Sequence, residues 1–135
     1  MTVTQLARVP AAPRTAPTIL IVDDDEYVHG ALAATLRGLR ARLLKARTAA
    51  EARQLALLHR PDLAIVDVGL PDRDGYELAA ELRDEPALAA MRVLILTGHA
   101  PDQAAADAAR AHGLVAKPFR LHPFLELVRT QLATR

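Results

Sequence analysis

PDLAIVDVGLPDRDGYEL, residues 61–78, is the stretch that decides the fold class. Its apolar run at residues 63–66 is continuous rather than alternating, which is typical of a strand buried on both faces of a parallel sheet. Pro61 ends the helix before this run, because proline cannot continue a helix interior. Asp67 follows the run directly, so this strand delivers a carboxylate at its C-terminal end.

On both sides of this stretch, short apolar runs alternate with longer amphipathic segments. This alternation predicts an α/β fold with a parallel sheet and helices on both of its faces. The predicted strands are residues 18–22, 42–46, 63–66, 93–96 and 114–116. The first three predicted helices are residues 26–39, 49–59 and 75–85.

Proline and threonine mark several of the predicted helix starts. Thr48 is a suitable N-cap for the second helix. Pro101 and Pro123 are predicted to lie in the first turns of the fourth and fifth helices, where the missing N–H of proline costs nothing. The fifth helix runs to the end of the chain, so we expect a single domain without a linker to a further module.

Length and composition predict one domain with a short leading segment. The chain has 135 residues, which is room for one ordinary domain, and 51% of them are hydrophobic. Residues 1–17 are rich in Pro and Ala without apolar periodicity, and we predict a flexible extension there, followed by the folded domain at 18–135. Both Arg8 and Arg14 lie in this acid-free extension, so the domain itself is close to neutral.

Composition also excludes several classes of function. A near-neutral domain with 3% aromatic residues lacks the basic stripe and stacking platform of nucleic-acid binders, so no direct binding to nucleic acid is expected. No cysteine is present, which excludes disulfides and thiolate metal sites. The longest apolar run near the start, residues 19–22, is too short for a signal or membrane segment. We therefore expect a cytoplasmic protein without membrane association.

Polar residues follow four of the predicted strands. They are Asp23 and Asp24 after the first, Asp67 after the third, Thr97 after the fourth and Lys117 after the fifth. Ligands of open α/β sheets gather beyond the carboxyl ends of the strands, so these side chains are predicted to form one site. Each acid taken alone fits a helix N-cap equally well, and the run at residues 23–26 could serve only for capping.

The recurrence of acids at two strand ends favours a functional site over capping. Crowded carboxylates repel unless a cation intervenes, and an oxygen-rich site with open positions suits Mg²⁺, which readily takes phosphate oxygens. Asp67 is the predicted nucleophile because it stands alone, whereas Asp23 and Asp24 share a strand end. Lys117 would offset charge on phosphoryl oxygens and Thr97 would offer them a hydroxyl.

Four sequence stretches in this order resemble the receiver domain of bacterial response regulators, across roughly residues 18–134. The stretches are ILIVDDDE at 19–26, PDLAIVDVGLPDRDGYEL at 61–78, VLILTGHA at 93–100 and AKPF at 116–119. The resemblance implies a flavodoxin-like, doubly wound sheet of five parallel strands in the order 2-1-3-4-5, with five helices. It also implies a signalling module that catalyses only its own phosphorylation and dephosphorylation.

The resemblance assigns roles to individual residues and partners. Asp67 is the expected phosphoacceptor, and Mg²⁺ is expected on Asp23, Asp24, Asp67 and the backbone carbonyl of Gly69. Thr97 and Lys117 match the signalling hydroxyl and the phosphate-contacting lysine. A sensor histidine kinase or histidine phosphotransfer protein would supply the phosphoryl group, and a downstream protein would read it. Pro71 and Gly75 match the turn after the acceptor strand, and the Lys117-Pro118 bond is expected to be cis.

The sequence departs from the family pattern near its C-terminal end. Leu114 occupies a position that is commonly aromatic, and the segment between Thr97 and Lys117 is about two residues shorter than usual. His99 is predicted to be an exposed loop residue that could tune dephosphorylation. The remaining histidines share no metal-ligand spacing and are predicted to lie on the surface: His29, His59, His112 and His122.

Three readings of function remain open from the sequence. A stand-alone receiver would switch partner binding on phosphorylation. The departures at Leu114 and in the shortened segment leave open an interaction module that is insensitive to phosphorylation. A metal-dependent phosphatase would use a D-x-D motif on its first strand, which Asp23 and Asp25 formally match, but the chain is too short for a cap domain.

Overall fold

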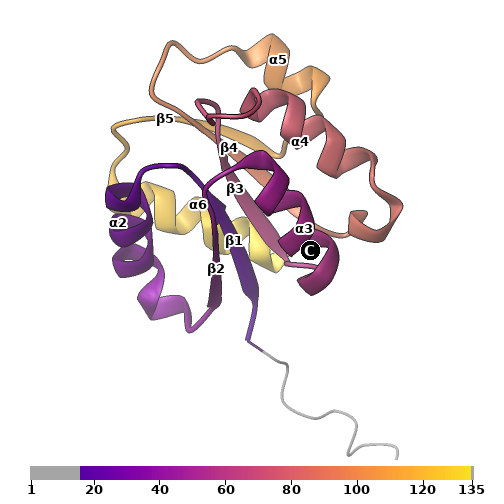
Figure 1. Ribbon diagram of the computed structural model, residues 1–135. Coiled ribbons are helices and arrows are strands. Elements are labelled where there is room, and N and C mark those ends of the chain that lie inside the picture. Colours follow the sequence, from indigo (N-terminus) through magenta and orange to yellow (C-terminus); the bar gives the residue numbers. More distant parts are fainter. Residues whose placement is uncertain (1–15, 135) are drawn as a thin grey trace, which may run out of the picture.

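The computed structural model describes residues 16–134, which form a five-stranded parallel sheet between two layers of helices (Figure 1). The strands are β1 (Thr18–Val22), β2 (Arg42–Ala46), β3 (Leu63–Asp67), β4 (Arg92–Thr97) and β5 (Gly113–Ala116). Their order is β2-β1-β3-β4-β5, so the predicted doubly wound topology is confirmed. The order reverses between β1 and β3, which is where such sheets bind ligands.

Helices cover the two faces of the sheet unequally. The α-helices are α2 (Glu26–Leu36), α3 (Ala49–His59), α4 (Gly75–Asp84), α5 (Gln103–Ala108) and α6 (Leu121–Ala133). Buried residues of α3, α4 and α5 share one hydrophobic cluster, and those of α2 and α6 share a second. Helices α3, α4 and α5 therefore lie on one face of the sheet, and α2 and α6 lie on the other (Figure 1).

The central strand β3 contributes to both clusters. Ala64 and Val66 belong to the cluster under α3, α4 and α5, whereas Leu63 and Ile65 belong to the cluster under α2 and α6. All five residues of β3 are buried. The apolar run in the sequence is continuous because alternate side chains of this strand point into two different cores, and both cores require apolar residues.

Short polar side chains start four of the helices. Asp25, Thr48, Asp74 and Asp102 each accept a backbone N–H from the first turn of the helix that follows. Such caps satisfy donors that have no partner inside the helix. The predicted cap at Thr48 is therefore confirmed.

Two helix predictions need correction. The helix predicted at 26–39 is α-helical only to Leu36 and continues as the 3-10 helix η1 (Arg37–Leu39). Pro101 does not lie in the first turn of α5, because the cap at Asp102 places the start of the helix at Gln103. Pro123 does lie in the first turn of α6. A second 3-10 helix, η2 (Pro86–Leu88), follows α4.

The histidine predictions also need correction. His29 is completely buried, not on the surface, because α2 turns this side chain toward the sheet with Leu32. His112 is half-buried, and its Nδ1 accepts the backbone N–H of Val93 at 2.9 Å. His122 is exposed as predicted, and His59 is partly buried.

Three further points concern the ends and the backbone of the chain. Residues 1–15 of the predicted extension lie outside the described residues, so its flexibility and its boundary at residue 17 stay predictions.

Among the described helices none is long and apolar enough to span a bilayer. The peptide bond between Lys117 and Pro118 is cis, as the resemblance implied.

Candidate functional site

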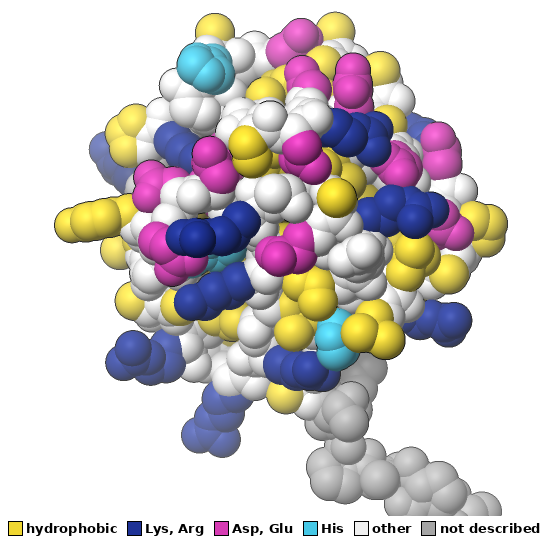
Figure 2. Space-filling model, in the orientation of Figure 1, with side chains coloured by type: hydrophobic (Ala, Val, Ile, Leu, Met, Phe, Trp, Pro, Cys, Tyr) yellow, Lys and Arg dark blue, Asp and Glu magenta, His cyan; other side chains and the backbone are white. Residues whose placement is uncertain are grey.

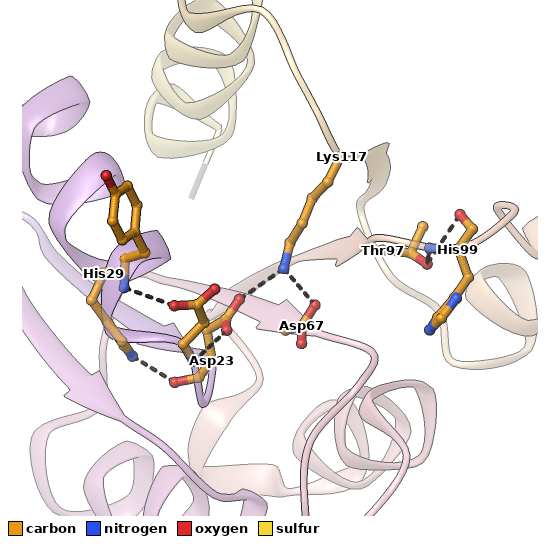
Figure 3. Close-up of polar contacts among 8 residues, drawn as sticks. Asp23, His29, Asp67, Thr97, His99 and Lys117 are labelled. Carbon is orange, nitrogen blue, oxygen red and sulfur yellow. Dashed lines mark hydrogen bonds and ion pairs between the residues drawn. The ribbon is translucent and has the colours of Figure 1, made fainter.

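Four of the predicted site residues lie at the carboxyl edge of the sheet. Asp23 follows β1, Asp67 is the last residue of β3, Thr97 is the last residue of β4, and Lys117 follows β5. All five strands are parallel, so these positions lie at the same edge. Figure 3 shows Asp23, Asp67 and Lys117 pointing toward one another across the strand ends.

Lys117 joins the two buried carboxylates. Its Nζ donates to Oδ1 of Asp67 at 2.9 Å and to Oδ2 of Asp23 at 3.0 Å. The side chains of Asp23 and Asp67 are 2% and 9% exposed, so water screens this interaction poorly. One ammonium group therefore holds together two acids that would otherwise repel each other.

Burial and charge shift the ionisation of both Asp67 and Lys117. Burial raises the pKa of the Asp67 carboxyl, and the charges of Asp23 and Asp24 add to the increase, against the hydrogen bond from Lys117. For Lys117, burial acts to lower the pKa, but the hydrogen bonds to Asp67 and Asp23 outweigh it and raise the pKa above its usual value. The ammonium form is therefore the stable one at neutral pH.

Three carboxylates provide a donor set that fits a divalent cation. One oxygen each of Asp23, Asp24 and Asp67 lies within 4.8 Å of the others. Asp24 is exposed, so the cluster opens to solvent on that side. Oxygen ligands with open positions are what Mg²⁺ prefers, since it keeps several of its waters. The residues present therefore fit the metal that the sequence predicts.

Asp25 takes no part in this cluster. It is exposed, and its Oδ1 accepts the backbone N–H of Tyr27 at 2.8 Å as the N-cap of α2. Within the acid run, Asp23 and Asp24 therefore belong to the carboxylate cluster, whereas Asp25 caps the helix. The second acid of the D-x-D match is engaged in capping, which removes the main support for a phosphatase of that kind.

Thr97 is buried at the end of β4 and bonded to the backbone of its own loop. Its Oγ1 accepts the N–H of His99 at 3.1 Å and lies 3.4 Å from the carbonyl oxygen of His99. Figure 3 shows Thr97 and His99 apart from the Asp67 and Lys117 pair. Thr97 therefore lies at the same edge of the sheet as the acidic cluster, but its hydroxyl is hydrogen-bonded to His99 and not to the cluster. His99 is exposed, as expected.

The loop after Asp67 depends on a close approach of two backbone segments. The N–H of Gly75 donates to the Val68 carbonyl at 2.9 Å. A Cβ at residue 75 would lie 2.1 Å from the backbone oxygen of Asp67, which no side chain allows. Gly69 forms a β-bridge with Asp74, and a Cβ at residue 69 would lie 3.6 Å from Asp67 Oδ2. The carbonyl of Gly69, which is predicted to bind metal, is thus in a loop held close to Asp67.

Asp72 is a contributor to this loop that the sequence analysis missed. Its carboxylate oxygens accept the N–H groups of Ala49 and Ala50, at 2.9 and 3.1 Å. These hydrogen bonds lower the pKa of Asp72 and connect the loop after β3 to the first turn of α3. Nothing in the local sequence indicates this contact, because the partners are 22 and 23 residues away.

The remaining surface carries mixed charge. Figure 2 shows acidic and basic side chains next to one another across the middle of one face. Several of these charges form ion pairs, such as Arg53 with Glu81 and Glu85, and Arg47 with Glu26. Exposed pairs of this kind contribute little to stability, about 0–1 kcal/mol each.

Comparison with known proteins gives one family. The family model of the response regulator receiver domain matches residues 19–129. The KDP operon transcriptional regulatory protein KdpE of Escherichia coli (strain K12) is 33% identical over 114 residues, which are 84% of this chain and 50% of that protein. The polar-differentiation response regulator DivK of Brucella anthropi is 26% identical over 117 residues, covering 85% of this chain and 95% of DivK.

Solved structures agree with this result. A protein described as a response regulator from Chloroflexus aurantiacus superposes with a TM-score of 0.82 and 36% identity, covering 88% of this chain and 99% of that one. The chain spans about half or less of the length of the first transcriptional regulators that it matches, and nearly the whole length of DivK. The likeness to the regulators therefore concerns their receiver part.

Proposed function

The chain belongs to the response regulator receiver domain family, and we propose that it accepts a phosphoryl group on Asp67 in a two-component signalling system. The observation that carries this proposal is the arrangement of Lys117, which donates to both Asp67 and Asp23 at the edge of the sheet. A cation on a partly buried carboxylate prepares that position for the negative charge of a phosphoryl group.

In the proposed reaction, an Asp67 oxygen attacks the phosphorus of a phosphohistidine on a sensor kinase or phosphotransfer protein. The P–N bond breaks, its electron pair stays on the imidazole nitrogen, and that nitrogen takes up a proton. The product is an acyl phosphate on Asp67. Lys117 keeps contact with Asp67 and offsets charge on the phosphoryl oxygens. The domain would act only on its own phosphorylation and dephosphorylation, not as an enzyme for other substrates.

The acidic cluster would hold the metal that this transfer needs. Asp23, Asp24, Asp67 and the Gly69 carbonyl are the proposed ligands, and the three carboxylates already lie within reach of one ion. When bound, Mg²⁺ neutralises charge on the phosphoryl oxygens. Thr97 would turn from His99 toward the phosphoryl group and so change the neighbouring surface. A downstream protein would read that change in the cytoplasm, without direct binding to nucleic acid or membrane.

A second candidate is an interaction module on the same fold that does not respond to phosphorylation. Leu114 favours it, because this half-buried aliphatic residue packs against the cluster under α3, α4 and α5 where relatives commonly have an aromatic ring. Equal binding of a partner by the phosphorylated and unphosphorylated protein would support this candidate over switching.

Phosphorylation itself can be tested with a small donor. The protein is incubated with Mg²⁺ and acetyl phosphate, and intact mass is measured for wild type, Asp67→Asn and Asp25→Asn. We expect wild type and Asp25→Asn, which keeps its helix cap, to gain one phosphoryl group only with metal present. Asp67→Asn should gain none. Equal labelling of Asp67→Asn and wild type would reject Asp67 as the acceptor.

A further inference from the structure

His29 is a buried polar residue that the proposed chemistry does not use. Its side chain is fully excluded from solvent. It lies on the buried face of α2, together with Leu32 and Leu36. Its Nε2 lies 2.7 Å from the backbone oxygen of Asp23, whereas Nδ1 has no partner. A carbonyl oxygen only accepts, so Nε2 carries a proton and donates it to this oxygen. Figure 3 shows this contact beside the acidic cluster.

Packing alone does not account for a histidine here. Burying a polar atom without a hydrogen-bond partner is unfavourable, and among the described residues Nδ1 of His29 is the one buried side-chain nitrogen or oxygen without a partner. A leucine or methionine would fill similar space without that penalty. The remaining feature that distinguishes histidine is the N–H that it directs at Asp23.

This N–H completes the set of bonds that hold Asp23. The backbone N–H of Asp23 donates to the Ala46 carbonyl at 3.0 Å, which fixes the peptide on one side of the residue. The bond from His29 fixes the peptide on the other side, between Asp23 and Asp24. The Asp23 carboxylate accepts from the N–H of Asp25 and from Lys117. His29 therefore controls the peptide plane from which both metal-site acids extend.

We propose that His29 is a positioning residue for the divalent metal: it orients the Asp23–Asp24 peptide, and thereby the two carboxylates, for the cation. Partners that hold metal ligands in place strengthen binding because the ligands lose less freedom when the ion arrives. The effect is greatest for Asp24, whose carboxylate is exposed while that of Asp23 is buried. This inference rests on the proposed metal-dependent function.

The test compares variants of the whole chain by calorimetric titration with Mg²⁺, without phosphodonor. His29→Leu removes the donor but keeps apolar volume, and His29→Met repeats this with a side chain that adapts to irregular space. His29→Gln restores an N–H near the position of Nε2. Leu36→Ala is the matched control, because it creates a cavity in the same helix away from Asp23. Circular dichroism verifies that each variant is folded during titration.

We expect His29→Leu and His29→Met to weaken Mg²⁺ binding roughly five- to tenfold, because each variant loses about one hydrogen bond that orients the ligands. His29→Gln should recover most of the affinity, and Leu36→Ala should bind as wild type does despite a lower melting temperature. Wild-type affinity in the folded apolar variants, or an equal loss in Leu36→Ala, would overturn the proposal for His29 alone. Wild type without any Mg²⁺ binding would overturn the metal-dependent function and this inference together.

Discussion

Strands β3 and β5 both contribute to the site, but they are held in different ways. Every residue of β3 is buried, and its neighbours on both sides are strands. β5 is an edge strand whose residues are half-buried or exposed. Asp67 is therefore fixed by packing, whereas Lys117 is held by its bonds to Asp67 and Asp23. The comparison indicates a firmly packed Asp67 next to a lysine-bearing segment that can move, since local stability follows burial.

The largest expected difference concerns the free energy of unfolding. Ile65→Ala in β3 removes a fully buried side chain and should cost about 3 kcal/mol. Val115→Ala in β5 removes a half-buried one and should cost about 1 kcal/mol. Urea denaturation monitored by circular dichroism measures both. Equal losses would show that β5 is packed as firmly as β3.

Lys117→Met tests whether charge holds β5 to the site. Without the ammonium group two buried carboxylates face each other, and we expect a loss of about 2 kcal/mol of unfolding free energy in metal-free buffer. Saturating Mg²⁺ should recover part of this loss in the same denaturation experiment, because a divalent cation also offsets the repulsion. Lys45→Met, on the exposed side of β2, is the control and should change stability little.

His112 gives a pH dependence to the junction between β4 and β5. Burial, with the charges of Arg92 and Arg83, lowers the pKa of His112 from 6.5 to about 4. The unfolded chain therefore binds the proton first as pH falls, and the native protein is favoured most above pH 6.5. This stability is lost progressively as pH falls toward 4 and does not decrease further below that value.

His112→Asn should reduce the dependence while keeping an acceptor for the N–H of Val93. We expect the unfolding free energy of wild type to fall by roughly 1 kcal/mol more than that of the variant between pH 7 and pH 4.5, after allowance for the solvent exposure of the ring. Urea titrations at several pH values measure this difference. Parallel curves for the two proteins would mean that protonation of His112 does not weaken the β4 contact.

The smallest expected effect concerns the loop after β4. His99 is exposed, and its backbone, not its ring, bonds Thr97. We therefore expect His99→Ala to change the lifetime of the acyl phosphate by no more than about threefold, or less than about 0.7 kcal/mol. Decay of the phosphorylated mass after removal of donor measures this lifetime. A change of tenfold or more would assign the ring a direct part in hydrolysis.

The sequence predicted most of the fold because the relevant signals are local. The apolar run at 63–66, the cap at Thr48 and the position of Asp67 each depend on neighbours within a few residues. Parallel strands then bring their ends to one edge, so the joining of Lys117 to Asp23 and Asp67 follows from topology. Errors arose where a local rule met a competing interaction, as at Pro101, where capping by Asp102 set the helix start.

Composition, strand pattern and motif order by themselves determined the α/β class, the strand ends that carry polar residues and the resemblance to receiver domains. Tertiary structure alone decided that Asp23 is bonded to Lys117, that His29 is fully buried, and that Asp72 reaches α3. The physical reason is the sequence separation over which each interaction acts. Periodicity and capping act between residues that are close in sequence. Burial and contacts between elements depend on how those elements pack, and similar residue patterns can pack in different ways.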